Sequence, residues 1–488
     1  MIFSITKTVL AGIIRIKEVI DLNFAGDPLI LFARRISSKI MEQIMPVILL
    51  AVVIVLIIFT TAKWKIHPLP VLLLGAALFG IAGNFGVVNT INMISGGFGN
   101  TMKSIGIVII SGTMIGVFME QRGALKVIAR KIINLTGEKR TPLAMAIIGY
   151  VVSICIFCDS AFIILIGLWK KIGKMTKIPL AIGATALSMG LFASHCFIPP
   201  TPGPLAAMSF LGADFGKVLL FGSLAALAAV TAGYIYASFA GKNETLAGEN
   251  ETIREDNSAE TVFQHHWSIA FLPIVIPLVL IGAGSAANVL KNSLPQKLTE
   301  FLIAAGNPVI ALGIGAVVAV FCIGKCKRSE LTADGLIGKA IIDAANILII
   351  TAAGGAFGEV LKQVDFRPLL PGNAENMGVF ALLLPLSFAS MLKIAQGSST
   401  LAILTAANVT LPLLEVLGLA TPVMRALTCC AVCCGSMIVS HTNDSFFWVV
   451  VKFSGMSVRQ GLKLQTIGTL VSGIAAAITL LIIAAVCI

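Results

Sequence analysis

The sequence predicts an all-α protein that crosses a membrane many times, arranged as two inverted repeats of about five transmembrane helices. Of the 488 residues, 57% are hydrophobic and 12% are charged, whereas a soluble domain carries about 25% charged residues. Because one crossing needs about 20 apolar residues, the chain allows roughly ten to twelve helical elements. Their approximate bounds are 46–62, 68–88, 104–121, 142–169, 178–210, 217–240, 267–290, 305–324, 336–361, 378–411, 413–453 and 464–488.

The net charge of +12 does not indicate nucleic-acid binding, because Lys and Arg are concentrated in short loops between apolar segments, as the positive-inside rule expects. Cys155 and Cys158 have the spacing of a metal site, but they lie inside an apolar segment, as do the cysteines between residues 429 and 434. Such cysteines are typical of helix packing. We therefore expect no nucleic acid, no metal and no cofactor.

The chain divides into four parts. Residues 1–44 are an atypical N-terminal extension without the pattern of a cleavable signal peptide, 45–240 form the first membrane repeat, 241–266 a hydrophilic linker and 267–488 the second repeat. The duplication is indicated by short motifs that recur in the same order and at nearly the same offset. Gly112-Thr-Met-Ile-Gly116 is matched by Gly354-Gly-Ala-Phe-Gly358, and Ser194-His195 is matched by Ser440-His441.

Loop charges predict the topology. The loops 122–140 and 170–177 are both strongly basic and so belong on the cytoplasmic side. The segment 142–169 between them must then enter and return as a re-entrant hairpin, because it is too short for two full spans. An odd number of crossings inverts the second half and makes 378–411 a hairpin from the opposite face, so each repeat has a re-entrant hairpin and a broken helix.

This scheme places the basic residues of the extension 1–44 outside, against the same rule. Two alternatives remain open. Either translation begins at Met41 or Met45, or the extension is an amphipathic helix at the membrane surface.

Four segments interrupt helices at membrane depth, where irregular backbone is tolerated only if it lines a cavity or is buried in protein. They are the tip at Asp159-Ser160, the proline-rich break 194–204, the tip 396–400 and the break 440–445. Hydroxyl, amide and imidazole groups there suit a carboxylate at a helix terminus. Small-residue packing is the alternative for Ser398, and a neutral imidazole between carbonyls is the alternative for the histidines. The substrate-binding candidates are Ser160, His195, Thr201, Gln396, Gly397, Ser398, Ser399, Thr400, His441, Asn443 and Ser445.

Asp159 and Asp444 are the candidates for proton coupling, because an ionised carboxylate is costly inside a membrane and readily exchanges a proton. For Asp444 the alternative is a structural carboxylate that caps a helix N-terminus. Glu120 and Glu359 lie near predicted span ends, where reaching to the surface explains them equally well. We leave both glutamates out of the core site.

Six motifs occur in order along the chain. They are Gly96-Gly-Phe-Gly-Asn-Thr101, Gly112 to Glu120, His195 with Pro199 to Pro204, Gly354 to Leu361, Gln396 to Thr400 and His441 to Trp448. Taken together, they resemble the gluconate:proton symporter family over the region from about residue 46 to the C-terminus. The resemblance implies an inner-membrane permease for gluconate or a related small hydroxy acid, and kinship with dimeric, elevator-type carriers that have paired hairpins. The chain departs from the family at Thr201, where a histidine is frequent, at Phe157-Cys158-Asp159 and in its extension.

The leading hypothesis is a secondary active transporter that imports gluconate or a related sugar acid with a proton, as a homodimer in the cell inner membrane. Its expected partners are the organic anion, the proton and the lipid bilayer. A sodium-coupled carrier for a dicarboxylate or an amino acid such as D-serine is the alternative. An enzyme using Asp159, His195 and His441 is disfavoured, because an enzyme has no need for inverted halves.

Overall fold

A computed structural model describes residues 45–487, except 47, 62, 138–139, 248–265, 292, 325 and 364–373. The chain forms two units, Met1–Val52 and Val53–Ile488. In the first unit, residues 45–46 and 48–52 are helical. The predicted extension 1–44 and residues 248–265 of the predicted linker lie outside the described residues, so the helices below belong to the second unit.

Every regular element in the described part of the chain is helical, without a strand, which confirms the all-α class. The helices before the linker are α3 (Pro68–Ala82), α4 (Val87–Gln121), α5 (Ala124–Thr136), α6 (Thr141–Val152), α7 (Cys158–Thr176), α8 (Leu180–Phe197), α9 (Pro202–Leu211) and α10 (Phe215–Ala240). Those after it are α11 (Trp267–Val289), α12 (Gln296–Ala305), α13 (Pro308–Phe321), η3 (Arg328–Leu331), α14 (Leu336–Leu361), η5 (Ala374–Leu382), α15 (Leu383–Gln396), α16 (Ser399–Thr410), η6 (Leu411–Leu413), α17 (Pro422–Met437), α18 (Ser445–Ser454), α19 (Val458–Gly461), the π-helical η7 (Leu462–Thr466) and α20 (Ile467–Cys487).

Seven helical segments of the described residues are long and apolar enough to cross a membrane, and the pair α12 and α13, bent by 61°, makes an eighth candidate. A polytopic helical protein is therefore confirmed. The segment expected at 104–121 is longer than predicted, because α4 already begins at Val87. Its polar first half continues the helix, which the hydropathy of the sequence alone does not reveal.

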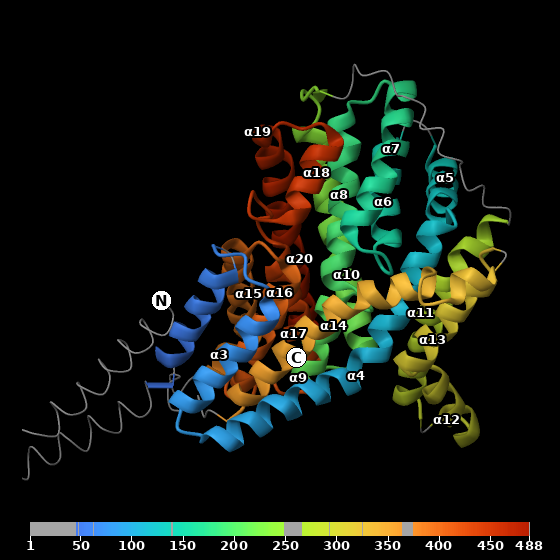
Figure 1. Cartoon of the computed structure of the whole chain (residues 1–488). Helices are drawn as coiled ribbons and strands as arrows, with labels where there is room; N and C mark the ends of the chain where they lie inside the picture. Colours follow the sequence, from blue (N-terminus) through green and yellow to red (C-terminus); the bar gives the residue numbers. More distant parts are fainter. Residues whose placement is uncertain are drawn as a thin grey trace, which may run out of the picture. The chain divides into compact units, whose positions relative to one another are not determined.

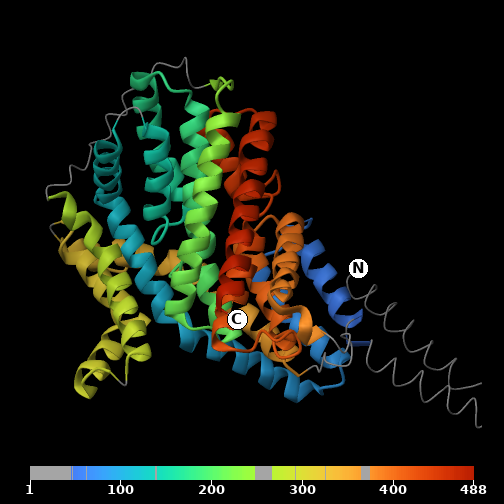
Figure 2. The same cartoon turned by 180° about the vertical axis from the view of Figure 1, so that it is seen from behind.

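Helices of the two halves pack against each other. Figure 1 shows α4 crossing α14, and Figure 2 shows α10 running beside α20. At the crossing of α4 and α14 the backbones approach so closely that a Cβ on Gly97 would meet the carbonyl oxygen of Gly355. The Thr101 side chain fills the adjacent space, where a Cβ on Gly355 would lie. Glycine at both positions therefore permits this contact.

Each half contains a helix–turn–helix followed by an interrupted helix and a long helix. In the first half these are α6 and α7, then α8 and α9, then α10; in the second, α15 and α16, then α17 and α18, then α20. With 12 residues, α6 is about 18 Å long, well short of a hydrocarbon core of about 30 Å. The turn of the first pair lies at 153–157, so the tip expected at residues 158–160 falls instead in the first turn of α7.

Candidate functional site

The ends of the short helices meet in the interior. The aromatic rings of Phe157 and His195 lie 6.1 Å apart and connect the turn 153–157 with the end of α8. The rings of Phe162 and Phe446, also 6.1 Å apart, connect α7 with α18. We call this meeting place the junction, and define it as the turn 153–157 with the start of α7, the interruption 198–201, the turn 397–398 and the interruption 438–444.

A buried ion pair lies at the centre of the junction. Lys393 Nζ on α15 is 2.6 Å from Asp444 Oδ2, and the two side chains are 1% and 4% exposed. Ser440 Oγ donates to the same carboxylate oxygen, while the backbone N–H of Phe446 donates to Oδ1 at 3.1 Å. Lys393 also donates to the carbonyl oxygen of Gly397 at 3.1 Å. Asp444 therefore caps α18 and has protein donors on both of its oxygens.

Lys393 is the residue that the sequence reasoning missed. It lies within the apolar segment 378–411, and the rule that marked Asp159 as functional applies equally to a lysine at membrane depth. Its ammonium group also sits 5.2 Å from the centroid of the Phe192 ring, a cation–π contact with α8. Lys393 thus contacts the turn 397–398, the interruption 438–444 and α8.

The turn 397–398 contacts the interruption 438–444 through backbone groups. Gly397 has a φ of +75°, and a Cβ there would meet the backbone carbonyl of Asn443. The carbonyl oxygen of Ile394 accepts a hydrogen bond from Asn443 Nδ2 at 2.7 Å and lies 3.1 Å from His441 Nε2. Both predicted site residues, Asn443 and His441, therefore contact the end of α15.

Several buried polar atoms at the junction have no hydrogen-bond partner. In native proteins such atoms are few, and each one needs an explanation such as a bound ligand or water. His195 lies one turn after Phe192, whose ring contacts Lys393. Asp159 lies one turn before Phe162, whose ring contacts Phe446 beside Asp444. The unpartnered atoms are Asp159 Oδ1, Ser194 Oγ, His195 Nδ1, Gln396 Oε1 and Ser399 Oγ.

The other predicted site residues lie in the same region with different surroundings. Ser398 Oγ accepts the N–H of Leu401 at 3.4 Å and so caps α16, and Thr201 Oγ1 donates to the carbonyl of Ile198 at 2.6 Å. Ser160 and Thr400 lie in the first turns of α7 and α16, whereas Ser445 begins α18 and is exposed.

Four helices begin at the junction, and three of them leave amide donors available. The first turn of α9 contains Pro202 and Pro204, which have no N–H. By contrast, α7 has no side-chain cap, and α16 and α18 have a single cap each, from Ser398 and Asp444. Free N–H groups at a helix N-terminus attract anions, so the starts of α7 and α16 are suited to a carboxylate.

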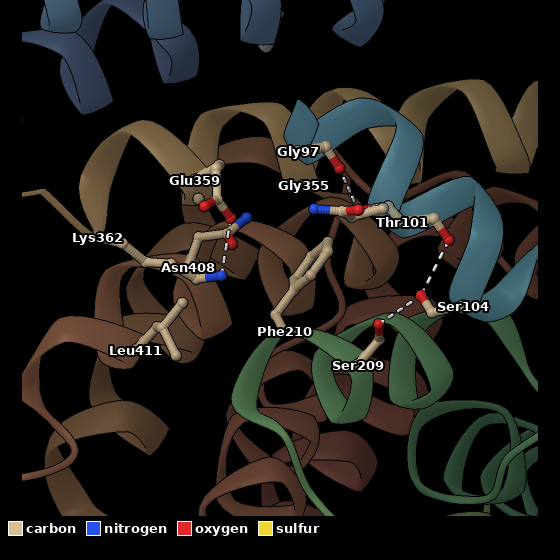
Figure 3. Close-up of a pocket in the computed structure, with 12 residues that line it drawn as sticks. Gly97, Thr101, Ser104, Ser209, Phe210, Gly355, Glu359, Lys362, Asn408 and Leu411 are labelled. Atoms are coloured by element: carbon tan, nitrogen blue, oxygen red, sulfur yellow. Dashed lines mark hydrogen bonds and ion pairs between the residues drawn. The ribbon is translucent and has the colours of Figure 1, made fainter. Parts of the chain in front are cut away.

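Two cavities lie near these elements. One of about 20 Å³ is bounded by the turn 154–157, by α4 and by residues 200–202, at the edge of the junction. The other measures about 230 Å³ and lies between α4, α9, α14 and α16 (Figure 3). Glu359, which we left out of the core site, lines this larger cavity. Among the described residues, no three His, Cys, Asp or Glu side chains are arranged to hold a metal ion.

Known proteins resemble this chain over most of its length. The L-idonate transporter of the Gnt-II system of Escherichia coli is 30% identical over 429 residues, which cover 87% of this chain and 95% of that protein. The gluconate permease of Pseudomonas aeruginosa is 28% identical and covers 86% of this chain and 92% of its own. The solved structure of Neisseria gonorrhoeae MtrF has a TM-score of 0.60 at 14% identity, covering 81% of this chain and 84% of that chain, so it shares the fold.

The relatives are permeases and transporters rather than enzymes, which agrees with a chain rich in candidate membrane spans. Residues 45–486 match the family described as GntP family permease, which confirms the resemblance read from the motifs. This chain is therefore a member of the GntP permease family.

Proposed function

We propose that the chain imports gluconate or a related small sugar acid across the cell inner membrane together with a proton, and that the junction is its binding site. Sugar acids are named as substrates of the two relatives described above. The single observation that carries the site is the cluster of buried, unpartnered polar atoms around the starts of α7 and α16. A carboxylate would accept the amide donors, and the substrate hydroxyls would pair with Gln396 and Ser399.

Asp159 is the proposed proton carrier. Asp444 is fully occupied by Lys393, Ser440 and a backbone amide, whereas Asp159 has an oxygen without a partner. A bound carboxylate and an ionised Asp159 would repel each other at short range. Substrate binding therefore favours protonation of Asp159, and protonation favours substrate binding, because the linkage between two ligands is reciprocal. Asp444 is the second candidate for proton coupling, and its role would depend on its ion pair with Lys393.

The proposal includes the architecture expected from the sequence. The helix–turn–helix pairs are re-entrant hairpins from opposite faces, in two inverted repeats at 45–240 and 267–488. The same order of hairpin, interrupted helix and long helix in both halves supports this arrangement, and so does the basic loop on either side of α6 and α7. Homodimerisation belongs to the proposal as an implication of the family resemblance.

Uptake into proteoliposomes tests the function. Radiolabelled gluconate should accumulate inside when an inwardly directed proton gradient is imposed, and a protonophore should abolish the accumulation. Accumulation driven by a sodium gradient alone would instead support the sodium-coupled carrier. A thermal-shift screen of the purified protein against sugar acids, hydroxy acids and D-amino acids identifies the preferred anion, and chemical analysis of the recovered ligand should find it unchanged.

A further inference from the structure

The cavity of about 230 Å³ lies apart from the junction, next to the end of α16 that is opposite to its Ser399 start. Polar side chains from α4, α9, α14 and α16 contribute to its wall (Figure 3). Its lining includes an acid, a base, two amides and, besides Thr101, two serine hydroxyls, and none of these takes part in the site proposed above. These six residues are Asn100, Ser104, Ser209, Glu359, Lys362 and Asn408.

Asn408 lines this cavity. Its side chain is buried, with 1% of the residue exposed, and its Nδ2 donates to the carbonyl oxygen of Gly354 at 2.7 Å. This bond fixes the orientation of the amide. Its Oδ1 has no hydrogen-bond partner and packs against Gly358, where a Cβ would overlap it. Asn408 therefore forms the inner wall of the cavity, at the contact of α14 with α16.

Opposite charges lie on the next turn of α14. Lys362 Nζ is 2.8 Å from Glu359 Oε2, but the two side chains are 45% and 30% exposed, so their mutual attraction contributes little. Both groups are therefore free to turn toward a ligand. Ser104 and Ser209, whose hydroxyl oxygens are 2.8 Å apart, supply further donors and acceptors from α4 and α9.

We call the line of contact between α4 and α9 the seam. The cavity and the junction lie at different points along it. Ser104 on α4 meets Ser209 on α9 at the cavity, and farther along the same seam a Cβ on Gly112 would lie 3.6 Å from Pro200 at the junction. As the numbers rise on α4 they fall on α9, so the two helices are antiparallel there. Eight residues of helix correspond to about 12 Å, which is too far for one small molecule to occupy both places.

We propose that this cavity is a second binding site, for a small organic acid with one carboxylate and at least one hydroxyl or ammonium donor nearby. The carboxylate binds Lys362, and the donor groups bind Glu359 and the hydroxyl oxygens of Ser104 and Ser209. The volume is smaller than that of pockets for drug-sized ligands, as this class of molecule requires. The inference rests on the proposed function for the class of ligand, and on the cavity alone for its location.

Protection of a single cysteine from alkylation tests the second site. Ser209→Cys is introduced into a chain whose accessible cysteines, Cys155, Cys322, Cys326 and Cys487, are replaced by alanine, and its reaction with a small charged thiosulfonate is followed. Gluconate represents hydroxy acids and D-serine represents amino acids, while sorbitol and acetate each lack one of the two required features. At about ten times the dissociation constant, the reaction rate should fall about tenfold with gluconate or D-serine, and remain unchanged with sorbitol or acetate.

Two further variants separate this site from the junction. Protection should survive in Ser399→Ala/Thr400→Val, which weakens the junction, and should be lost in Lys362→Met. Lys217→Met is the matched control, because Lys217 is a similarly exposed lysine on α10 that pairs with an acid away from the cavity, and it should leave protection intact.

The possible results are distinct. Protection that disappears in Ser399→Ala/Thr400→Val would assign the effect to the junction and overturn the second site. If the thiol introduced by Ser209→Cys is unprotected, or is reached by no reagent, in a protein that still transports sugar acids, the second site is overturned as well and the proposed function stands. Protection in a protein that transports no sugar acid would support the second site while the transport proposal fails.

Discussion

Lys393 and Asp444 are 51 residues apart in the chain, yet their side chains form a hydrogen-bonded ion pair of 2.6 Å that is almost fully buried. A buried charge whose partner is removed costs about 3–5 kcal/mol. Lys393→Met and Asp444→Asn should therefore each lower the free energy of unfolding in detergent by about this amount, and the double variant should recover part of the loss. Lys362→Met, at the exposed pair, is the control and should change it by less than about 1 kcal/mol. Simple additivity in the double variant would contradict a direct interaction.

Asp159→Asn should separate transport from proton coupling. Asparagine mimics the protonated carboxyl group and has no proton to carry, so accumulation of gluconate under a pH gradient should be lost. Exchange of internal for external gluconate, which needs no net proton movement, should continue. Both activities are measured in the same proteoliposomes. Normal accumulation by this variant would transfer the coupling role to Asp444 or to a histidine.

Neighbouring residues at the turn 397–398 and at the start of α16 should separate binding from stability. Ser399→Ala and Thr400→Val should each weaken gluconate binding by about 1–2 kcal/mol, the cost of losing a hydrogen bond to a charged group. Ser398→Ala should mainly lower stability, by about 1 kcal/mol, because the Ser398 side chain caps α16. Calorimetric titration and thermal unfolding measure the two effects. Unchanged affinity in both of the first variants would remove this turn from the binding site.

The topology predicts where labels attach. If α6 and α7 form a re-entrant hairpin, single cysteines at Arg140 and Lys177, both exposed, should react with impermeant reagents from the cytoplasmic side. A cysteine at Ser160 should react with small aqueous reagents and be protected by substrate, because the start of α7, next to the turn 153–157 at membrane depth, faces water or ligand. Labelling of positions 140 and 177 from opposite sides would show that this segment crosses the membrane once, which would contradict the inverted repeat.

Glu244 predicts a dependence of stability on pH. Its carboxylate accepts hydrogen bonds from Lys463 Nζ at 2.8 Å and Gln460 Nε2 at 3.0 Å, and these bonds lower its pKa below the ordinary value of 4.5. The contribution to stability is present above pH 4.5 and is lost as the pH falls through the lowered pKa. The free energy of unfolding should therefore fall as the pH is lowered from 4.5 through this pKa. Glu244→Gln should reduce that fall. An equal loss in both proteins would assign it to other groups.

The sequence contains enough information for the helical interruptions, but not for the contacts among them. Proline clusters and basic loops are local signals, and they locate the interruption after α8 and the α6–α7 pair. By contrast, His195 and His441 occupy matching positions in the sequence and have different surroundings. His195 Nδ1 has no partner, whereas His441 Nε2 lies against the carbonyl of Ile394. A sequence repeat does not specify which neighbour each copy meets.

The larger cavity has no counterpart in the sequence patterns. Its wall combines residues from Gly97 to Leu411, and their proximity depends on the close crossing of α4 and α14. Pairs of glycines permit this crossing, but their presence in the sequence does not predict it. Lys393 is a different case, because the rule for ionisable groups in a membrane was sufficient to find it.

The separation of Lys393 from Asp444 also matters while the protein is being made. Ribosomes add about 5–20 residues per second, so Lys393 emerges roughly 3–10 seconds before the aspartate that neutralises it. A lone lysine within a newly inserted apolar segment is costly, and Lys393 lies in the last turn of α15. During this interval only the apolar residues of α15 favour its insertion, and the ion pair adds its contribution once synthesis has passed Asp444.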